Sequence, residues 1–251
     1  MDTTTVYSIK AEKYAKYRWD YALNAIDAIA DITKLSSTST IADIGAGTGI
    51  LTRHFTNMVQ RIYAIEPNVE MREMLVKELG TCSTVSVVDG CAENTKLANS
   101  SVDVITVAHA IHWFDPEPAR REMMRILTDG GWLVLVRNFN LENEQERVIG
   151  SLMTEEYGAD FTVVKEQPQN KPSCFYFGNG TFQNLTFPFQ FNQSYEEFIG
   201  ALTTASFMPD EDHPLFKKLE TKAREVFSQY SKNGYMLVEG KTELIIGQPS
   251  R

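Results

Sequence analysis

The sequence predicts an α/β fold built on a largely parallel sheet. Three observations support this prediction: β-branched apolar segments recur along the first half of the 251-residue chain, segments with helical spacing stand between them, and turn-forming residues separate the two. Strands that alternate with helices are typical of parallel sheets, because a parallel connection needs a crossover that is usually helical. The predicted strands are 40–44, 61–65, 85–88, 102–108 and 132–136.

Helices are predicted where apolar residues recur at three- and four-residue spacing or where capping residues stand. The N-terminal flank is expected to be helical up to about Asp31, because its apolar residues share one face. Asn68 is predicted to cap the helix before the third strand, and the Gly130–Gly131 pair to end the helix before the fifth. The other predicted helices span about 49–58, 68–79 and 115–129.

The second half of the chain gives weaker signals. Residues 138–180 are polar and have no clear period, whereas 181–191 alternate aromatic and polar residues and are predicted to form a strand. Helices are expected over 195–205 and 214–230, and a final strand or hairpin over 235–247.

Composition excludes several classes of protein. The chain has 24 Lys+Arg and 33 Asp+Glu, a net charge of −9, which argues against a nucleic-acid partner because such partners leave clustered basic residues. Cys82, Cys91 and Cys174 show no C-x-x-C spacing, so we expect neither a disulfide framework nor a zinc or other metal site. No apolar run approaches the roughly 18 residues of a membrane span, and no signal-peptide pattern opens the chain. We therefore expect one soluble, cytoplasmic domain without a membrane partner.

The most specific feature is a glycine-rich turn, Asp43-Ile44-Gly45-Ala46-Gly47-Thr48-Gly49, between a predicted strand and a predicted helix. Glycine adopts backbone conformations that are closed to other residues and lets a ligand approach the main chain. The helix N-terminus that follows would offer unpaired N–H groups. The turn therefore predicts a cofactor site.

Two classes of cofactor use such a turn. A dinucleotide fingerprint requires glycine at the first, third and sixth positions, but the sixth position counted from Gly45 is Ile50. Asp43 would repel a phosphate and attract a cationic group such as the sulfonium or ammonium of S-adenosylmethionine (SAM). Glu66, at the end of the second strand, is placed to accept hydrogen bonds from ribose hydroxyls in either class. The residues favour SAM over a nicotinamide cofactor.

Several blocks in order resemble class I SAM-dependent methyltransferases, and more narrowly the methyltransferase type 11 group that includes trans-aconitate methyltransferase-like enzymes. The resemblance implies a Rossmann-like sheet of seven strands, mostly parallel with an antiparallel last strand, with helices on both faces and a helical cap or lid. It covers about residues 40–137. The matching blocks are 43–49, 64–68 with Met71, 90–93, 108–115, and 125–127 before Gly130–Gly131.

The resemblance also implies how the single domain, 1–251, is organised. An N-terminal helical flank, 1–35, precedes the SAM-binding core, 40–137. Residues 138–180 are expected to form either a lid insertion or a peripheral packing insertion, and 181–251 is expected to complete the sheet.

Residue roles follow from the same resemblance. The methionine part of SAM is expected against the glycine turn and its ribose on Glu66, while Asn68 and Met71 would flank the adenine. The expected cofactor-binding residues are Asp43, Gly45, Ala46, Gly47, Glu66, Asn68, Met71, Cys91, Ala92, Glu93, Ala108, Arg18 and Tyr17.

His112 is the candidate catalytic residue, because an imidazole with a pKa of about 6.5 suits proton abstraction near neutrality. A carboxylate acceptor would need no base, since a carboxylic acid with a pKa of about 4 is already ionised at neutral pH. His112 would then only shape the pocket. Tyr14, Trp113 and Arg137 are the expected substrate-binding residues. Arg137 and Arg18 are the candidate partners of an anionic substrate, and binding of the SAM carboxylate is the competing role of Arg18.

Three functions stay open on these observations. The first is a methyltransferase that uses SAM to methylate a small molecule at an oxygen, such as a carboxylate or hydroxyl, by in-line displacement. The second is a SAM-binding regulatory or scaffold protein without turnover, and the third is a nicotinamide-dependent oxidoreductase. The sequence does not predict the oligomeric state.

Overall fold

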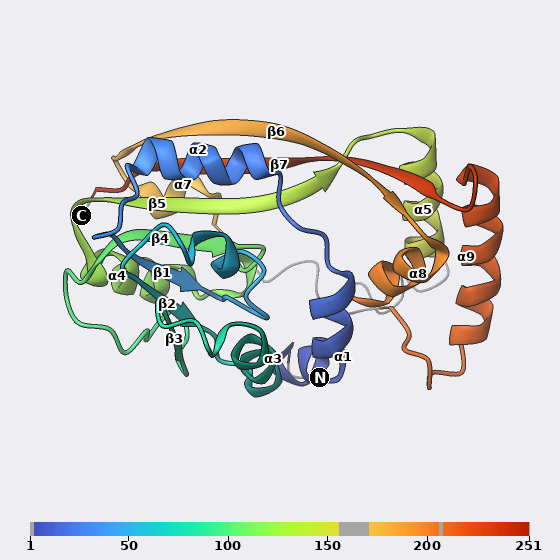
Figure 1. The fold of residues 1–251 in the computed structure, drawn as a ribbon, viewed down its shortest axis with the longest axis horizontal. Helices are drawn as coiled ribbons and strands as arrows, with labels where there is room; N and C mark the ends of the chain where they lie inside the picture. The colour runs from blue at the N-terminus through green and yellow to red at the C-terminus, as the bar shows by residue number, and fades with distance from the viewer. Residues whose placement is uncertain (1–2, 156–170, 206–207, 251) are drawn as a thin grey trace.

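Among the described residues, seven strands form one sheet with the spatial order β3-β2-β1-β4-β5-β7-β6 (Figure 1). The computed structural model describes residues 3–155, 171–205 and 208–250. Strands β1 to β5 are mutually parallel, and β7 runs antiparallel to both of its neighbours, β5 and β6. The predicted mostly parallel sheet with an antiparallel last strand is confirmed. The strands are β1 (Thr40–Ile44), β2 (Arg61–Ile65), β3 (Val85–Val88), β4 (Val102–Ala108), β5 (Leu127–Asn140), β6 (Thr181–Gln193) and β7 (Met236–Gln248).

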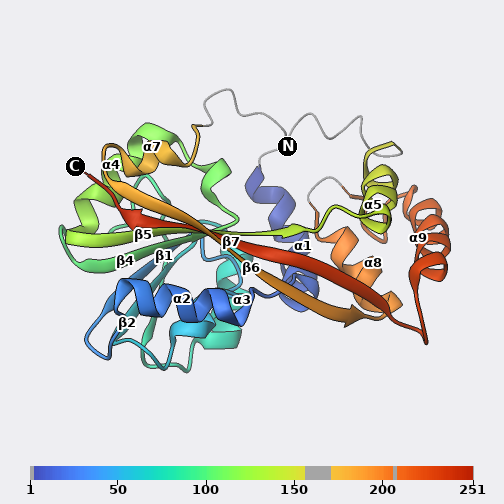
Figure 2. The same cartoon turned by 90° about the horizontal axis from the view of Figure 1, so that it is seen from above.

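Helices cover both faces of this sheet. Figure 2 shows α2 on one face and α4 with α7 on the other. Ile26 and Ile29 of α2 pack with residues of β1, β5 and β7, whereas Met123 of α4 and Phe177 of α7 pack on the opposite side. The helices are α1 (Thr3–Tyr17), α2 (Leu23–Thr33), α3 (Val69–Leu79), α4 (Pro116–Ile126), α5 (Glu144–Glu155), α7 (Cys174–Phe177), α8 (Tyr195–Thr203) and α9 (Phe216–Tyr230), with 3₁₀ turns η1 (Thr52–Phe55) and η2 (Ile111–Trp113).

Beyond the ends of β5, β6 and β7, the helices α5, α8 and α9 form a separate group, which we call the distal helices (Figures 1 and 2). They have a hydrophobic core of their own, in which Leu152, Phe198 and Leu219 are buried. Helix α1 contacts both α3 and α8, so it bridges the sheet and the distal helices. No helix in the described ranges is both long and apolar enough to cross a membrane.

The helix predicted over 49–58 is wrong. The structure has only the short η1 there, flanked by turns. Gly47 and Gly49 both adopt positive φ, 57° and 88°, so neither can be part of a right-handed helix and the predicted start at Gly49 is excluded. The Thr56 hydroxyl then donates to the carbonyl of Arg53, a side-chain bond that competes with regular helix hydrogen bonding.

The prediction that the glycine pair 130–131 ends a helix is wrong, because the pair lies inside β5. Helix α4 ends at Ile126 and the chain continues directly into the strand. The pairing of β4 with β5 shifts between Val102, which faces Leu127, and Val104, which faces Trp132. The glycines therefore form an irregularity in the ladder, where Gly130 has a φ of 74°.

The N-terminal flank is helical as predicted but is broken into α1 and α2 by residues 18–22, called the linker below. Of the predicted lid, 156–170 lie outside the described residues. Its described parts belong to two hydrophobic cores. Tyr176 and Phe177 of α7 are buried against the sheet, and Ile149 of α5 is part of the core that α5 shares with α8 and α9. Whether 138–180 acts as a lid stays a prediction.

Candidate functional site

A cavity of about 260 Å³ lies at the carboxyl ends of β1, β2 and β4, and we call it the first cavity. Because parallel strands end at the same edge of a sheet, the residues that follow each strand meet there. Most of the predicted cofactor-binding residues line it, as do the predicted substrate-binding residues Tyr14 and Trp113. The lining includes Asp43, Gly45, Ala46, Gly47, Glu66, Asn68, Met71, Cys91, Ala92, Glu93 and Ala108.

The glycine turn is tied to the end of the neighbouring strand. The N–H groups of Gly45 and Ala46 both donate to the carbonyl of Ile65, at 2.9 and 3.0 Å. Gly45 has a φ of 71°, and a Cβ on it would lie 2.5 Å from the Cβ of Ala110. Gly47 has a φ of 57°, but a Cβ there would have no atom within 4 Å. The first glycine is required by close packing as well as by backbone conformation, the second by conformation alone.

Glu66 joins β2 to this turn. One carboxylate oxygen accepts the N–H of Gly47 and the other accepts the N–H of Asn68, each at 2.9 Å. The side chain of Asn68 in turn accepts the N–H of Met71, which confirms it as the N-cap of α3. Glu66 is 8% exposed, and its burial raises the pKa of the carboxyl, although the two N–H donors oppose this effect. The carboxylate therefore faces the cavity in one fixed orientation.

Asp43 lines the cavity but has hydrogen-bond partners on both oxygens. Thr52 donates to Oδ2 at 2.6 Å and Thr106 donates to Oδ1 at 2.8 Å. The residue is 1% exposed, and burial raises the pKa of its carboxyl. Asp43 thus fixes η1 to β1 and β4 at the base of the turn, and its contribution to a ligand is its charge and position.

The loop after β3 closes on itself. Cys91 and Asn94 exchange two backbone hydrogen bonds, at 3.2 and 3.1 Å, and the Glu93 carboxylate accepts the N–H of Asp115. Burial raises the pKa of the Cys91 thiol, with Glu93 adding to the effect. Cys91 is therefore held as a neutral thiol, and Glu93 is committed to the start of α4.

Thr48 is a site residue that sequence reasoning did not select. It is 4% exposed, lines the first cavity, and its hydroxyl is buried without a hydrogen-bond partner among the described residues. A buried hydroxyl that lacks a partner is costly, by about 1–3 kcal/mol, unless a ligand supplies one. The position of Thr48 inside the glycine turn could have identified it as a site residue from the sequence.

His109 is the second residue missing from the predicted site. It has a φ of 50°, and its ring lines the cavity, stacked on Tyr21 at 6.3 Å between centroids. Its Nε2 accepts the N–H of Asn138 at 2.8 Å, so the neutral ring carries its proton on Nδ1. Burial lowers the pKa of His109 to about 3, and the nearby charge of Arg18 adds to this. The ring is a neutral hydrogen-bond donor at neutral pH and its Nε2 is not available as a base.

His112 and Trp113 lie in η2, after β4. Trp113 lines the first cavity, whereas His112 is exposed and its ring packs on that of Trp113 at 4.8 Å. Loss of surrounding water lowers the pKa of His112, and the charge of Arg18 lowers it further. His112 supports the cavity wall through Trp113.

Besides His112, three predicted residues do not line the first cavity. Tyr17 donates to the Glu196 carboxylate at 2.9 Å, and the Arg18 guanidinium lies over the Tyr14 ring at 5.5 Å. Arg137 donates to Glu243 at 2.6 Å and covers the ring of Phe139.

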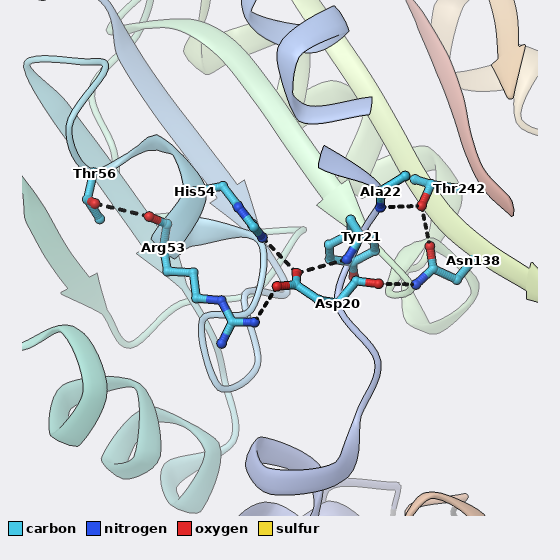
Figure 3. A network of polar contacts seen from close by, with 8 residues as sticks. All are labelled: Asp20, Tyr21, Ala22, Arg53, His54, Thr56, Asn138 and Thr242. Atoms are coloured by element: carbon cyan, nitrogen blue, oxygen red, sulfur yellow. Dashed lines mark hydrogen bonds and ion pairs between the residues drawn. The ribbon is translucent and has the colours of Figure 1, made fainter. Parts of the chain in front are cut away.

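A polar network holds the linker against the sheet (Figure 3). The Asp20 carboxylate accepts from Arg53 at 2.6 Å and bonds His54 at 2.7 Å, and these partners lower the pKa of Asp20. The Asn138 side-chain amide donates to the carbonyl of Asp20 at 2.9 Å and accepts from the Thr242 hydroxyl at 2.7 Å. The linker is thereby fixed to η1, β5 and β7.

Part of the chain matches known methyltransferases in sequence. Residues 42–135 match the family model described as a methyltransferase domain. An uncharacterised methyltransferase of Mycobacterium tuberculosis is 37% identical over 125 residues, 50% of this chain and 49% of the relative. One of Schizosaccharomyces pombe is 33% identical over 126 residues, also 50% and 49%. The chain spans about half the length of the curated relatives it matches.

Solved structures share the fold. A protein of Anaeromyxobacter dehalogenans, described as a candidate type II methyltransferase, has a TM-score of 0.66 at 18% identity and covers 93% of this chain and 100% of its own. The YcgJ protein of Bacillus subtilis has a TM-score of 0.55 at 20% identity, with 92% and 100% covered.

The sheet order agrees with the fold that these solved structures share, and the glycine turn lies within the part of the chain that matches the methyltransferase domain. Residues 42–135 are the part of the chain that matches the methyltransferase domain family.

Proposed function

We propose that the protein is a SAM-dependent methyltransferase that acts on an oxygen of a small acceptor. The observation that carries this proposal is the arrangement of Glu66: its carboxylate is oriented by the N–H groups of Gly47 and Asn68, at the edge of a cavity formed by the glycine turn. A carboxylate at this position suits a ligand that presents ribose hydroxyls, and the glycine spacing of the turn, not Glu66, distinguishes SAM from a nicotinamide cofactor.

The residues present fit SAM. The Thr48 hydroxyl is buried and has no partner in the described part of the chain, and the space above Gly47 is open, so the turn offers a donor and close main-chain approach. Glu66 would hold the ribose hydroxyls, the turn would hold the methionine part, and Met71, which is buried at the start of α3, would contact the adenine. The nicotinamide alternative is disfavoured because Ile50 occupies the place of the third fingerprint glycine and is 7% exposed.

Bound SAM would supply a sulfonium-activated methyl group, which leaves the protein mainly the task of positioning, worth roughly 7–11 kcal/mol. The chain's own residues exclude water and orient the acceptor: Tyr14, Tyr21 and Trp113 provide aromatic walls, and such rings also stabilise a nearby cation by about 0.5–2 kcal/mol. His109 can donate one hydrogen bond from its neutral ring to an oxygen in the cavity. Oxygen methylation of an ionised acid needs no base, which agrees with a site whose cavity-lining histidine is held neutral.

Calorimetric titration with S-adenosylhomocysteine, the demethylated product, tests the cofactor. Wild-type protein should bind it, and Glu66→Gln should weaken binding by about tenfold or more, because one acceptor oxygen becomes a donor. Glu73→Gln on the exposed side of α3 is the matched control and should bind like wild type.

Absence of binding by wild-type protein, or protection by NAD in its place, would reject the proposal. Binding without methylation of any acid or phenol, together with a stable protein partner, would favour the regulatory or scaffold alternative. Methylation assays with a panel of acids and phenols also test the resemblance to trans-aconitate methyltransferase-like enzymes.

A further inference from the structure

A second cavity, of about 170 Å³, lies between the linker and the distal helices. It is formed where the linker, the ends of β5 and β6, helices α5 and α8, and the start of β7 come together (Figure 1). The walls that α5 and α8 contribute lie outside the family match, which ends at residue 135, and outside the predicted cofactor site. Its lining includes Arg18, Trp19, Glu146, Phe198, Ala201 and Leu202.

The two cavities adjoin each other through two residue pairs. Arg18 lines the second cavity and lies over the ring of Tyr14, which lines the first. Asn138 lines the second cavity and donates its N–H to His109, which lines the first. A group bound beside Arg18 and Asn138 is therefore next to the cavity proposed for the cofactor.

This wall is fixed before any ligand arrives. Arg18 and Trp19 immediately precede Asp20, whose carbonyl and carboxylate are bonded to Asn138, Arg53 and His54 (Figure 3). Trp19 also packs edge-on against two rings of β6, at 5.6 and 6.4 Å. Groups held in place in the free protein lose little entropy on binding.

The polar lining suits one carboxylate. The Arg18 guanidinium is exposed where the cavity opens and forms no ion pair with the described part of the chain. The indole N–H of Trp19, the next residue, is buried with no hydrogen-bond partner among the described residues. A guanidinium and an adjacent N–H donor are the groups that bind a carboxylate.

The remaining lining combines apolar residues with one acidic residue and the uncharged polar residues Tyr17, Asn140, Gln193 and Thr204. Phe198 and Leu202 of α8 are 3% and 6% exposed, and Met236 and Val238 of β7 are 1% exposed. Glu146 of α5 is the acidic residue of the lining, and its carboxylate already accepts a hydrogen bond from Asn140. Among the lining residues only Arg18 is cationic, so a second carboxylate on a ligand would have no cation to pair with and would be repelled by Glu146.

We propose that the second cavity is the acceptor site, and that the acceptor is a small monocarboxylic acid with an apolar body. This inference rests on the proposed function. The carboxylate binds Arg18 and Trp19 beside the first cavity, and the body fills the space between α5, α8 and β7. A cavity of about 150 Å³ holds benzene, so the body is about the size of one aromatic ring.

The chemistry of transfer to such an acid balances without a further reagent. The new bond joins a carboxylate oxygen to the methyl carbon, and the carbon–sulfur bond breaks with its electron pair staying on sulfur. A carboxylate and a sulfonium become a methyl ester and a neutral thioether, so no proton leaves. Arg18 on this account is a residue that binds the acceptor, not the carboxylate of SAM.

Benzoate is the probe, titrated into protein saturated with S-adenosylhomocysteine. Its neutral isostere benzamide and propane-1,2,3-tricarboxylate are the comparison ligands. Wild-type protein should bind benzoate about tenfold more tightly than either. In Arg18→Gln the preference of benzoate over benzamide should fall to about twofold or less, while the affinities for benzamide and S-adenosylhomocysteine stay unchanged. Lys217→Gln, an exposed position on α9, is the control.

A second variant fills the site. Ala201→Phe places a ring in the cavity and should abolish benzoate binding while S-adenosylhomocysteine still binds. If this variant does not fold, Arg18→Gln alone tests the proposal.

An equal loss of affinity for benzoate and benzamide in Arg18→Gln would make Arg18 merely structural and overturn the proposal. A tenfold loss of S-adenosylhomocysteine affinity in that variant would assign Arg18 to the cofactor and overturn it too. If wild-type protein binds S-adenosylhomocysteine but not benzoate, the acceptor site is wrong; if it binds neither, the proposed function itself fails.

Discussion

The backbone N–H of Asn138 donates to Nε2 of His109 at 2.8 Å, and this one bond fixes which nitrogen of a cavity-lining imidazole carries the proton. It also joins the end of β5 to the residue after β4, which adopts a left-handed backbone conformation with a φ of 50°. A histidine in this setting contributes a hydrogen-bond donor to the site and resists protonation. The consequence can be measured in the stability of the protein.

The free energy of unfolding should depend on pH through His109. Its pKa is about 3 in the folded protein and about 6.5 when unfolded, so between these values the unfolded chain binds more protons and stability falls as the pH falls. The slope from one such group approaches about 1.4 kcal/mol per pH unit. Urea unfolding over this range should show a shallower slope for His109→Gln, whose amide oxygen can still accept the Asn138 N–H. Parallel curves for the two proteins would contradict the assignment. Asp43 and Glu66, with raised pKa values, act in the opposite direction in both proteins.

Alanine should be tolerated better at Gly47 than at Gly45. Both positions have positive φ, which costs an alanine about 1–2 kcal/mol. At Gly45 the new Cβ would also lie 2.5 Å from Ala110, and overpacking of this kind adds about 1–3 kcal/mol. Denaturant unfolding of the two variants checks the order, and equal losses would show that the β1 turn can move away from η2.

Removing the carboxylate of Asp43 should destabilise the core at the base of the turn. Thr52 and Thr106 are 0% exposed, so Asp43→Ala leaves two buried hydroxyls without an acceptor, at about 1–3 kcal/mol each. Asp43→Asn keeps one acceptor oxygen, and its amide can donate to the other hydroxyl, so its loss should be less than half as large. A thermal or urea comparison decides, and an asparagine variant as unstable as the alanine would point to the charge itself.

His112→Ala should slow methylation without changing the shape of the pH–rate profile. The ring is exposed and supports Trp113, and proton abstraction from an ionised acid is not required. Rates of wild type and variant across the range where an imidazole titrates give the comparison. Loss of a limb near the ordinary histidine pKa of about 6.5 would restore His112 as the general base.

The parts of the fold that could be predicted were those encoded locally. The strands 40–44, 61–65, 85–88 and 102–108 match the structure because each is a short run rich in β-branched and other apolar residues between turn signals. The predicted 49–58 helix does not form. Gly47 and Gly49, at its expected start, have positive φ, and the apolar pattern of the sequence does not show this.

Much of the first cavity could also be predicted, because residues that follow successive parallel strands must meet at one edge. The place of His109 could not, since it depends on the pairing of β4 with β5 and on an unusual backbone conformation. The second cavity was beyond reach for a related reason: it brings Arg18 together with residues of α5, α8 and β7 that are more than a hundred positions away along the chain.

Strand β7 is the last strand along the chain but stands between β5 and β6 in the sheet. During synthesis β5 and β6 leave the ribosome first, and they cannot pair natively with each other because the place between them is reserved. Each keeps a row of unpaired main-chain groups until Met236–Gln248 emerges, and such edges recruit other chains. Sheet closure is therefore a late event in biogenesis, and a nascent chain stalled before Met236 is the species most in need of a chaperone.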